Sequence, residues 1–167
     1  MVRKVYKWNS SLVECINPVA NTWMVLWGKN SEGLDRGEEV ISYLSETIDH
    51  KPTLEEVKSI ITNWYNSIID QEILTGYTWQ GIPVWLSLEN QVNYKAIYDL
   101  ALQNNDELLP VTIKLGTTDN TVYYTFDDID TLKEFYVGAV KHIQSALAKG
   151  WEVKKEIDWS IYKNSLE

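Results

Sequence analysis

The spacing of apolar residues predicts a first long helix over residues 53–71. Apolar side chains recur here at every third or fourth position, which is the spacing of one buried helical face. They are Leu54, Val57, Ile61, Trp64 and Ile68, with Ile60 and Tyr65 alongside. Thr53 and Glu56 have the spacing of a capping box, in which each side chain satisfies a free backbone N–H group. We therefore expect the helix to begin at Thr53.

The same periodicity predicts two more helices. The second has Ser87 as its expected N-cap and ends near Asn104. Its apolar stripe comprises Val92, Ala96, Ile97, Leu100 and Ala101. The third runs from about Asp128 to Gly150, because glycine suits the left-handed C-cap position. Its stripe comprises Leu132, Phe135, Tyr136, Ala139, Val140, Ile143 and Leu147. The short amphipathic tail, residues 151–162, is expected to pack as a strand or a turn.

Between the helices the pattern alternates with a period of two, which predicts two β-hairpins. The first joins residues 77–79 to residues 82–86, with Gln80-Gly81 as a two-residue turn. Pro83 cannot donate to a ladder, so it confines the second strand to a sheet edge. The second hairpin joins residues 111–115 to residues 121–126.

Residues 1–50 are predicted to be rich in β-structure. Candidate strands cover residues 2–8, 12–16 and 22–27, the last being apolar on both faces, with a turn at Asn9-Ser10-Ser11. Residues 28–39 are polar and contain glycine, so we expect a loop. Residues 40–48 fit a strand better than the alternative helix. The best candidate for a boundary in the chain is the His-Lys-Pro sequence at 50–52, because proline disfavours helix in the residue before it.

These elements predict an α+β fold with two parts. Residues 1–50 would form a β-rich N-terminal module that acts as a docking or oligomerisation arm. Residues 51–167 would form an α+β domain in which three helices pack with two β-hairpins. A chain of 167 residues with 44% hydrophobic residues can build a core of its own.

Charge and cysteine content narrow the classes of partner. Fifteen basic and 24 acidic residues give a net charge of −9, which disfavours nucleic acid and anionic membranes as partners. Cys15 is the sole cysteine, so neither an intrachain disulfide nor a cysteine metal cluster is expected. The first residues lack the apolar run of a signal peptide. The strongly apolar run Trp23–Trp27 is far too short to span a bilayer. We therefore expect a soluble protein.

No catalytic motif is recognisable, and we predict no catalytic residue, cofactor or metal ligand. His50 and His142 are the two histidines, and neither belongs to a known nucleophile or metal motif. Asp127, Asp128 and Asp130 resemble a cation site or a carboxylate pair, but capping of the third helix explains them better. A hydrolase acting through Asp128 and Asp130 is a third, less favoured alternative.

Tryptophan and tyrosine are abundant, with eight and ten residues against two phenylalanines. Both combine an apolar body with a polar group, which suits interfaces and sugar-binding faces as well as cores. Trp79 and Trp85 should lie on opposite faces of the first hairpin, so one of them is expected to be exposed; Trp64 is expected in the core. The candidate contacts for a partner or a glycan are Tyr77, Trp79, Trp85 and Trp151. The side chains of Glu89-Asn90-Gln91 are expected to pin the hairpin and loop beside the start of the second helix, and hydrogen bonding to a ligand is the less favoured alternative.

One set of residues occurs along the chain in a distinctive order. The set is Ile73, Leu74, Gly76 and Tyr77, then Gly81, then Glu89, Asn90 and Gln91, and finally Gly150 and Trp151. In this order the set resembles a domain of unknown function found in bacteriophage tail-fibre and other virion-associated proteins of gut-bacterial phages. The similarity covers roughly residues 51–160. A crAss-like phage particle is one context left open by it.

The resemblance implies a non-enzymatic structural component of a virion, serving as a fibre- or tail-associated adaptor or attachment protein. Its expected location is the virion, after synthesis and assembly in the host cytoplasm. The expected partners are other virion proteins, further copies of the chain and a host surface glycan. The alternative is a carbohydrate-binding module that uses its exposed tryptophans.

Overall fold

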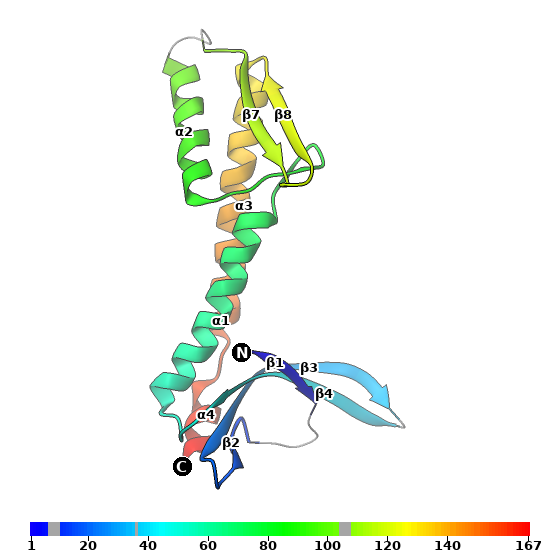
Figure 1. Ribbon diagram of the computed structural model, residues 1–167, viewed down its shortest axis with the longest axis vertical. Coiled ribbons are helices and arrows are strands. Elements are labelled where there is room, and N and C mark those ends of the chain that lie inside the picture. The colour runs from blue at the N-terminus through cyan, green and yellow to red at the C-terminus, as the bar shows by residue number, and fades with distance from the viewer. Residues whose placement is uncertain (7–10, 36, 104–107) are drawn as a thin grey trace. The chain divides into compact units, whose positions relative to one another are not determined.

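The computed structural model describes residues 1–6, 11–35, 37–103 and 108–167 (Figure 1). Within them the helices are α1 (Leu54–Thr75), α2 (Leu88–Gln103), α3 (Ile129–Lys155) and α4 (Trp159–Leu166). The strands form three separate antiparallel sheets. The expected α+β class is confirmed. Asn9 and Ser10 of the predicted turn lie outside the described residues. So does Asn104, near which the second helix was expected to end.

The chain folds into two compact units. The terminal unit comprises Met1–Trp64 together with Glu156–Glu167, and the central unit comprises Tyr65–Lys155. The terminal unit therefore includes both ends of the sequence, which a division at residue 50 would separate. Within it, the indole of Trp64 meets that of Trp27 edge-on with ring centroids 6.0 Å apart. Lys51 Nζ donates to the carbonyl of Leu166 at 2.6 Å, which ties the start of α1 to α4.

A four-stranded sheet forms most of the terminal unit, in the order β1-β4-β3-β2. Its strands are β1 (Arg3–Tyr6), β2 (Val13–Asn17), β3 (Thr22–Asp35) and β4 (Glu38–Ile48). Met24, Val25, Leu26 and Trp27 are all buried, so the apolar part of β3 is covered on both faces, as predicted. The β-strand assignment for residues 40–48 is also confirmed.

The polar segment after Trp27 continues as a strand, so the predicted loop over residues 28–39 is wrong. Backbone pairing of β3 with β4 extends to Asp35, with register shifts beside Gly28 and Gly33, which both have positive φ angles. The Glu32 carboxylate accepts hydrogen bonds from Lys4 Nζ at 2.7 Å and Ser42 Oγ at 2.6 Å. These bonds hold the pKa of Glu32 down at about 2. Long-range pairing has overridden the local loop preference.

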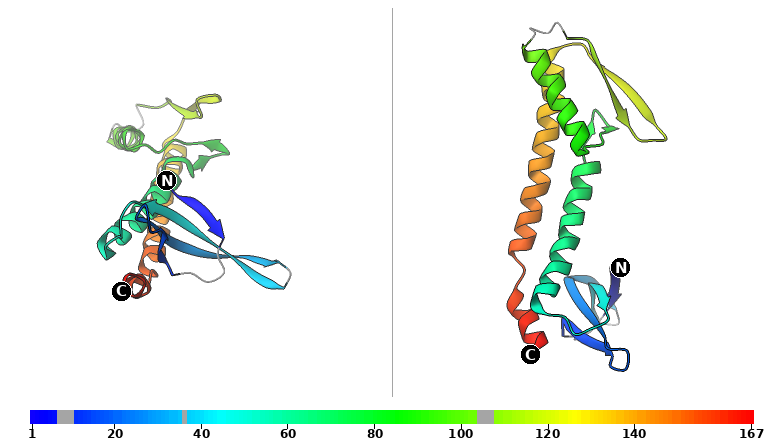
Figure 2. Two further views of the ribbon diagram at one scale, coloured as in Figure 1. Left: turned by 60° about the horizontal axis from the view of Figure 1, so that its bottom comes forward. Right: turned by 60° about the vertical axis from the view of Figure 1, so that its left-hand side comes forward.

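The central unit combines α2, α3 and the last part of α1 with two hairpins, as Figure 2 shows for the helices. The hairpins are β5 (Thr78–Trp79) with β6 (Ile82–Pro83), and β7 (Val111–Gly116) with β8 (Thr121–Phe126). Gln80 and Gly81 both have positive φ angles. Positive φ at both central residues is what a type I′ turn requires. Both predicted hairpins are therefore confirmed. The buried core is formed by Val84, Leu86, Tyr94, Ala101, Ile113, Leu115, Phe126, Leu132, Phe135 and Ala139.

Helix α2 is rotated relative to the prediction, since only Ile97 and Ala101 of the predicted stripe face the core. Val92, Ala96 and Leu100 are exposed, and the side that faces the core carries Tyr94, Ile97, Tyr98 and Ala101. Tyr94 packs edge-on against Phe135, with centroids 5.1 Å apart, and Tyr98 stacks on Tyr136 at 5.0 Å. The two tyrosines are about one helical turn apart and so lie on one face of the helix. The predicted stripe consisted of aliphatic residues and therefore left out Tyr94 and Tyr98. The packing of these two aromatic rings determines which face of α2 is buried.

The third helix and the tail also depart from prediction. Gly150 is not a C-cap: it is buried inside α3, which continues to Lys155. Residues 151–162 are largely helical rather than a strand or turn. Asp158 caps α4 by accepting from Ser160 N at 2.9 Å, which favours a helix there. In the last part of α1, Ile69 is buried and Ile68 is exposed, so the predicted stripe is displaced by one residue beyond Trp64.

Candidate functional site

An open hollow of about 700 Å³ in the central unit is the candidate site. Four segments line it: the end of α1, the connection from β6 to α2, the first turn of α2, and β7 with the turn that follows. The lining residues are Thr75, Pro83, Val84, Trp85, Asn90, Lys114, Leu115, Gly116, Thr117 and Thr118. The hollow thus combines one large aromatic ring with an ammonium group, an amide and several hydroxyl groups.

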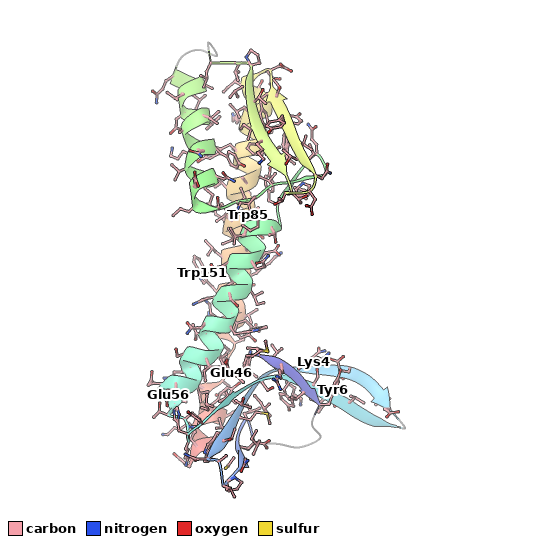
Figure 3. All side chains as sticks on the ribbon, in the orientation of Figure 1. Lys4, Tyr6, Glu46, Glu56, Trp85 and Trp151 are labelled. Carbon is pink, nitrogen blue, oxygen red and sulfur yellow. The ribbon has the colours of Figure 1, made fainter. Side chains whose placement is uncertain are left out.

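Trp85 points outward because its neighbours on both sides are buried. Val84 and Leu86 belong to the core, and their backbone N–H groups donate to the carbonyls of Tyr77 and Leu74, each at 3.0 Å. An extended chain alternates its side chains, so Trp85 between them faces away from the core. Its side chain remains 49% exposed. Figure 3 shows it beside the start of α2.

The start of α2 fixes the backbone of Trp85. Ser87 Oγ accepts from the backbone N–H of Asn90 at 3.3 Å. This bond makes Ser87 the expected N-cap. Asn90 Nδ2 donates to the carbonyl of Trp85, and Gln91 Nε2 donates to that of Leu86, both at 2.8 Å. The amides therefore pin the loop beside the helix start, as predicted, and they also hold the indole of Trp85 on a rigid support.

Trp79 has the opposite environment and is part of the core packing. Its ring lies 5.6 Å from Phe135, 6.0 Å from Phe126 and 6.2 Å from Tyr124, measured between centroids. Its indole N–H is buried and has no hydrogen-bond partner among the described residues. The predicted separation of Trp79 and Trp85 onto different faces is therefore correct, and Trp85 is the exposed member.

The other two candidate contacts lie outside the hollow. Tyr77 is partly buried, and its hydroxyl donates to the carbonyl of Phe135 at 2.9 Å. Burial raises the pKa of Tyr77 to about 12. Trp151 lies on α3 and is 61% exposed, and Figure 3 shows it beside the helices. The structure therefore places Trp85 in the hollow and the other three predicted residues elsewhere.

Sequence reasoning did not identify the polar lining contributed by the second hairpin. Lys114 points outward from β7, and Thr117 and Thr118 belong to the turn after Gly116. Gly116 has a φ angle of 87°, which turns the chain sharply at this point. The alternation of β7 indicated that Lys114 is exposed. Nothing in the local sequence indicated that it lines the same hollow as Trp85, because α2 separates the two segments in the sequence.

An indole face surrounded by hydroxyl, amide and ammonium groups suits a polyhydroxylated ring. The apolar face of a sugar stacks on tryptophan, and its hydroxyl groups pair with donors and acceptors at the rim. Asn90 uses one amide hydrogen for the Trp85 carbonyl, which leaves its Oδ1 as an acceptor. The hollow can therefore accept a neutral or anionic saccharide unit.

Of the acidic residues at the start of α3, Asp128 has a structural role. Asp128 Oδ1 accepts from the backbone N–H of Thr131 at 2.7 Å, and Oδ2 accepts from its hydroxyl at 2.9 Å. These bonds lower the pKa of Asp128. This is the predicted helix cap. Among the described residues, no group of three or more His, Cys, Asp or Glu side chains could hold a metal ion.

A second, smaller hollow of about 250 Å³ lies between α2 and α3 and is mainly apolar.

No helix in the described part of the chain has the length and apolar character that crossing a membrane requires. In comparisons with known proteins, no family model, curated protein or solved structure matches the chain.

Proposed function

We propose that this chain is a non-enzymatic adaptor or attachment component of a bacteriophage particle, associated with a fibre or the tail. The observation that carries the proposal is the division into two compact units with different surfaces. The terminal unit extends a polar two-stranded arm formed by β3 and β4, and the central unit holds an open aromatic hollow. A protein that joins two partners needs two such surfaces. The resemblance of residues 51–160 to virion-associated domains supports the same role.

In this proposal, the strands within residues 1–50 supply the docking or oligomerisation arm, and the phage-type domain, expected over residues 51–167, is centred on the central unit, Tyr65–Lys155. The partners are other virion proteins and further copies of the chain. The protein is made and assembled in the host cytoplasm and resides in the virion.

Mass spectrometry of purified particles tests the proposal. The particles come from the phage or induced prophage whose genome encodes the chain, and density-gradient purification removes free protein. We expect the chain in intact particles at a fixed ratio to the major fibre or tail proteins. Its absence from intact particles, with abundant chain in the lysate, would overturn the proposal.

Saccharide binding at the Trp85 hollow is the second candidate function. The specific observation in its favour is the half-exposed indole beside Lys114, Asn90 and Thr117 in one hollow. A glycan array identifies candidate ligands, and titration followed by NMR of the indole N–H groups measures binding. We expect Trp85→Ala to abolish binding.

Trp151→Ala is the matched control, because Trp151 is similarly exposed but lies outside the hollow. Binding should survive this change. No response on the array, or equal loss with both variants, rules out the hollow as a saccharide site. Neither result bears on the presence of the chain in particles, so the two proposals are tested separately.

A further inference from the structure

Strand β8 presents an unprotected sheet edge. Strands at a sheet edge expose unpaired N–H and C=O groups, to which another strand can pair. The hairpin β7–β8 is a sheet of two strands, so each strand has one free edge. Strand β6 lies close to β7 rather than to β8. In Figure 1, β8 lies on the side of β7 that is away from α2. The free edge of β8 is therefore the outer one.

Of the other edge strands of the described chain, β5 has only two residues, and the remaining four carry features that usually prevent such pairing. These features are charged side chains, proline and register irregularities. Strand β1 carries Arg3 and Lys4, and β7 follows Pro110 and carries Lys114. Strand β2 carries Glu14 and a register shift and is followed by Pro18, and the two-residue strand β6 contains Pro83.

Strand β8 carries none of these features. Its sequence, TVYYTF, has no charge, no proline and no glycine, and consists of β-branched and aromatic residues that favour strands. Its six pairs with β7 run from Val111–Phe126 to Gly116–Thr121 without a register shift. Tyr123 is 71% exposed on the outer face, between the exposed Thr121 and Thr125.

The edge is also complementary to itself. In an antiparallel pair, residues directly opposite each other point to the same face. A two-fold axis at Tyr123 places Tyr123 opposite Tyr123 of the second copy and Thr121 opposite its Thr125. Val122 then lies opposite Tyr124 of the second copy on the inner face. Polar and aromatic groups therefore meet on the outer face, and apolar groups meet on the inner face.

Existing cross-strand rows would continue into the second copy. Thr112 and Thr125 are paired across the hairpin with their hydroxyl oxygens 2.9 Å apart, and Thr121 of the second copy extends this row. The inner row that begins with Ile113 and Tyr124 would continue through Val122 and Leu115 of the second copy. The two Lys114 residues would be separated by two tyrosines, so no like charges would be adjacent.

We propose that β8 is the surface through which two copies of this chain associate, forming one antiparallel sheet in the order β7-β8-β8-β7. The proposal does not depend on the phage role. The net charge of −9 on each copy opposes association, whereas β8 itself is uncharged. Added salt should therefore strengthen the dimer, because it screens the repulsion between copies.

Sedimentation equilibrium of the full chain tests the proposal. We expect a monomer–dimer equilibrium that Tyr123→Lys weakens at least about tenfold, the change produced by a loss of about 1.4 kcal/mol. The control is Trp151→Lys, which also replaces an exposed aromatic ring by lysine, but on α3 and away from the β8 edge. It should leave the equilibrium near that of the parent chain.

A cross-linking experiment keeps the proposal testable if Tyr123→Lys fails to fold. Tyr123→Cys in a Cys15→Ser background should form a disulfide-linked dimer on mild oxidation, because the two-fold axis brings the two residues face to face. Thr112→Cys in the same background should remain monomeric. A parent chain that is monomeric at all concentrations, equal effects of the two lysine variants, or equal cross-linking at positions 123 and 112 would each overturn the proposal.

Discussion

Gly150 of α3 lies directly against Ile69 of α1. A Cβ atom at position 150 would overlap both Cδ1 and Cγ1 of Ile69, so the absence of a side chain is what admits Ile69. Both residues are buried within the central unit. The contact explains why a glycine is accommodated inside a long helix such as α3. A glycine in a helix interior costs roughly 1 kcal/mol relative to alanine.

Gly150→Val should therefore lower the free energy of unfolding by about 1–3 kcal/mol, the usual cost of overpacking a core. Urea denaturation measures the change. Ala148→Val is the control, because Ala148 is exposed on the same helix. The control should cost less than about 1 kcal/mol, since only helix propensity changes.

Ile69→Ala should partly relieve the defect, so that the double variant is more stable than the sum of the two single changes implies. Strict additivity of the two changes would contradict the contact.

Tyr77→Phe should destabilise the chain by about 1 kcal/mol, since it removes a hydrogen bond. The bond lost is the one to the carbonyl of Phe135.

As pH rises, the Tyr77→Phe variant should also lose less stability than the parent chain does. The pKa of Tyr77 is raised from 10.0 to about 12, so in this window the folded chain retains a proton that the unfolded chain releases. Stability of the parent chain therefore falls as pH rises through the window.

Urea denaturation at about pH 8 and about pH 11, on either side of the ordinary tyrosine pKa, measures both effects of the Tyr77 change. An unchanged dependence of stability on pH in the variant would contradict the role given to the buried hydroxyl.

His50 should titrate with a pKa above its usual value of about 6.5. Its ring nitrogens lie 3.0 Å from the carboxylates of Asp49 and Glu56, and these contacts raise its pKa, Asp49 having the larger effect. Because the folded-state pKa is raised, the stabilisation is fully present below the unfolded pKa and is lost as pH rises through the folded value. NMR titration measures the pKa of His50, and its signals are easily assigned because the sequence has only two histidines.

Glu56→Gln provides the matched comparison for His50. It retains an oxygen for the capping box with Thr53 but removes the charge beside His50. We expect the pKa of His50 to fall towards its ordinary value in this variant. A pKa for the parent chain at or below that value would show that these contacts do not persist in solution.

Gln91→Ala should destabilise the chain by about 1–2 kcal/mol, because it leaves a carbonyl without its amide donor. That carbonyl belongs to Leu86, whose side chain is fully buried. Gln103→Ala is the control: it makes the same chemical change on the exposed end of α2 and should be neutral or slightly stabilising. Thermal unfolding of the two variants makes the comparison. Equal melting temperatures for Gln91→Ala and Gln103→Ala would contradict the proposed role of the Gln91 amide.

Features that depend on neighbouring residues were predicted well from the sequence. Thr53 and Glu56 form the capping box: Thr53 N donates to Glu56 Oε2 at 2.7 Å, and Glu56 N donates to Thr53 Oγ1 at 3.3 Å. The turn at Gln80-Gly81 and the placement of Trp79 and Trp85 on opposite faces also follow from local rules, although these rules did not say which of the two is exposed. Capping, turn conformation and alternation each act over a few residues, so the sequence records them directly.

Features that depend on distant partners were not predicted. The strand after Trp27 is held by β4 and by the contact of Glu32 with Lys4, which no local window includes. The buried face of α2 is chosen by Phe135 and Tyr136, which belong to a different helix. In the candidate site, Trp85 was expected, but Lys114 and Thr117 come from another hairpin.

The terminal unit consists of Met1–Trp64 and Glu156–Glu167, and this affects the order in which the protein forms during translation. A ribosome completes Tyr65–Lys155 before it adds the segment that includes α4. The central unit can therefore fold while the terminal unit still lacks α4, whose partner is β2. Until α4 emerges, the nascent chain exposes the surface of β2 that α4 later contacts, and during this interval that surface is open to association with other chains.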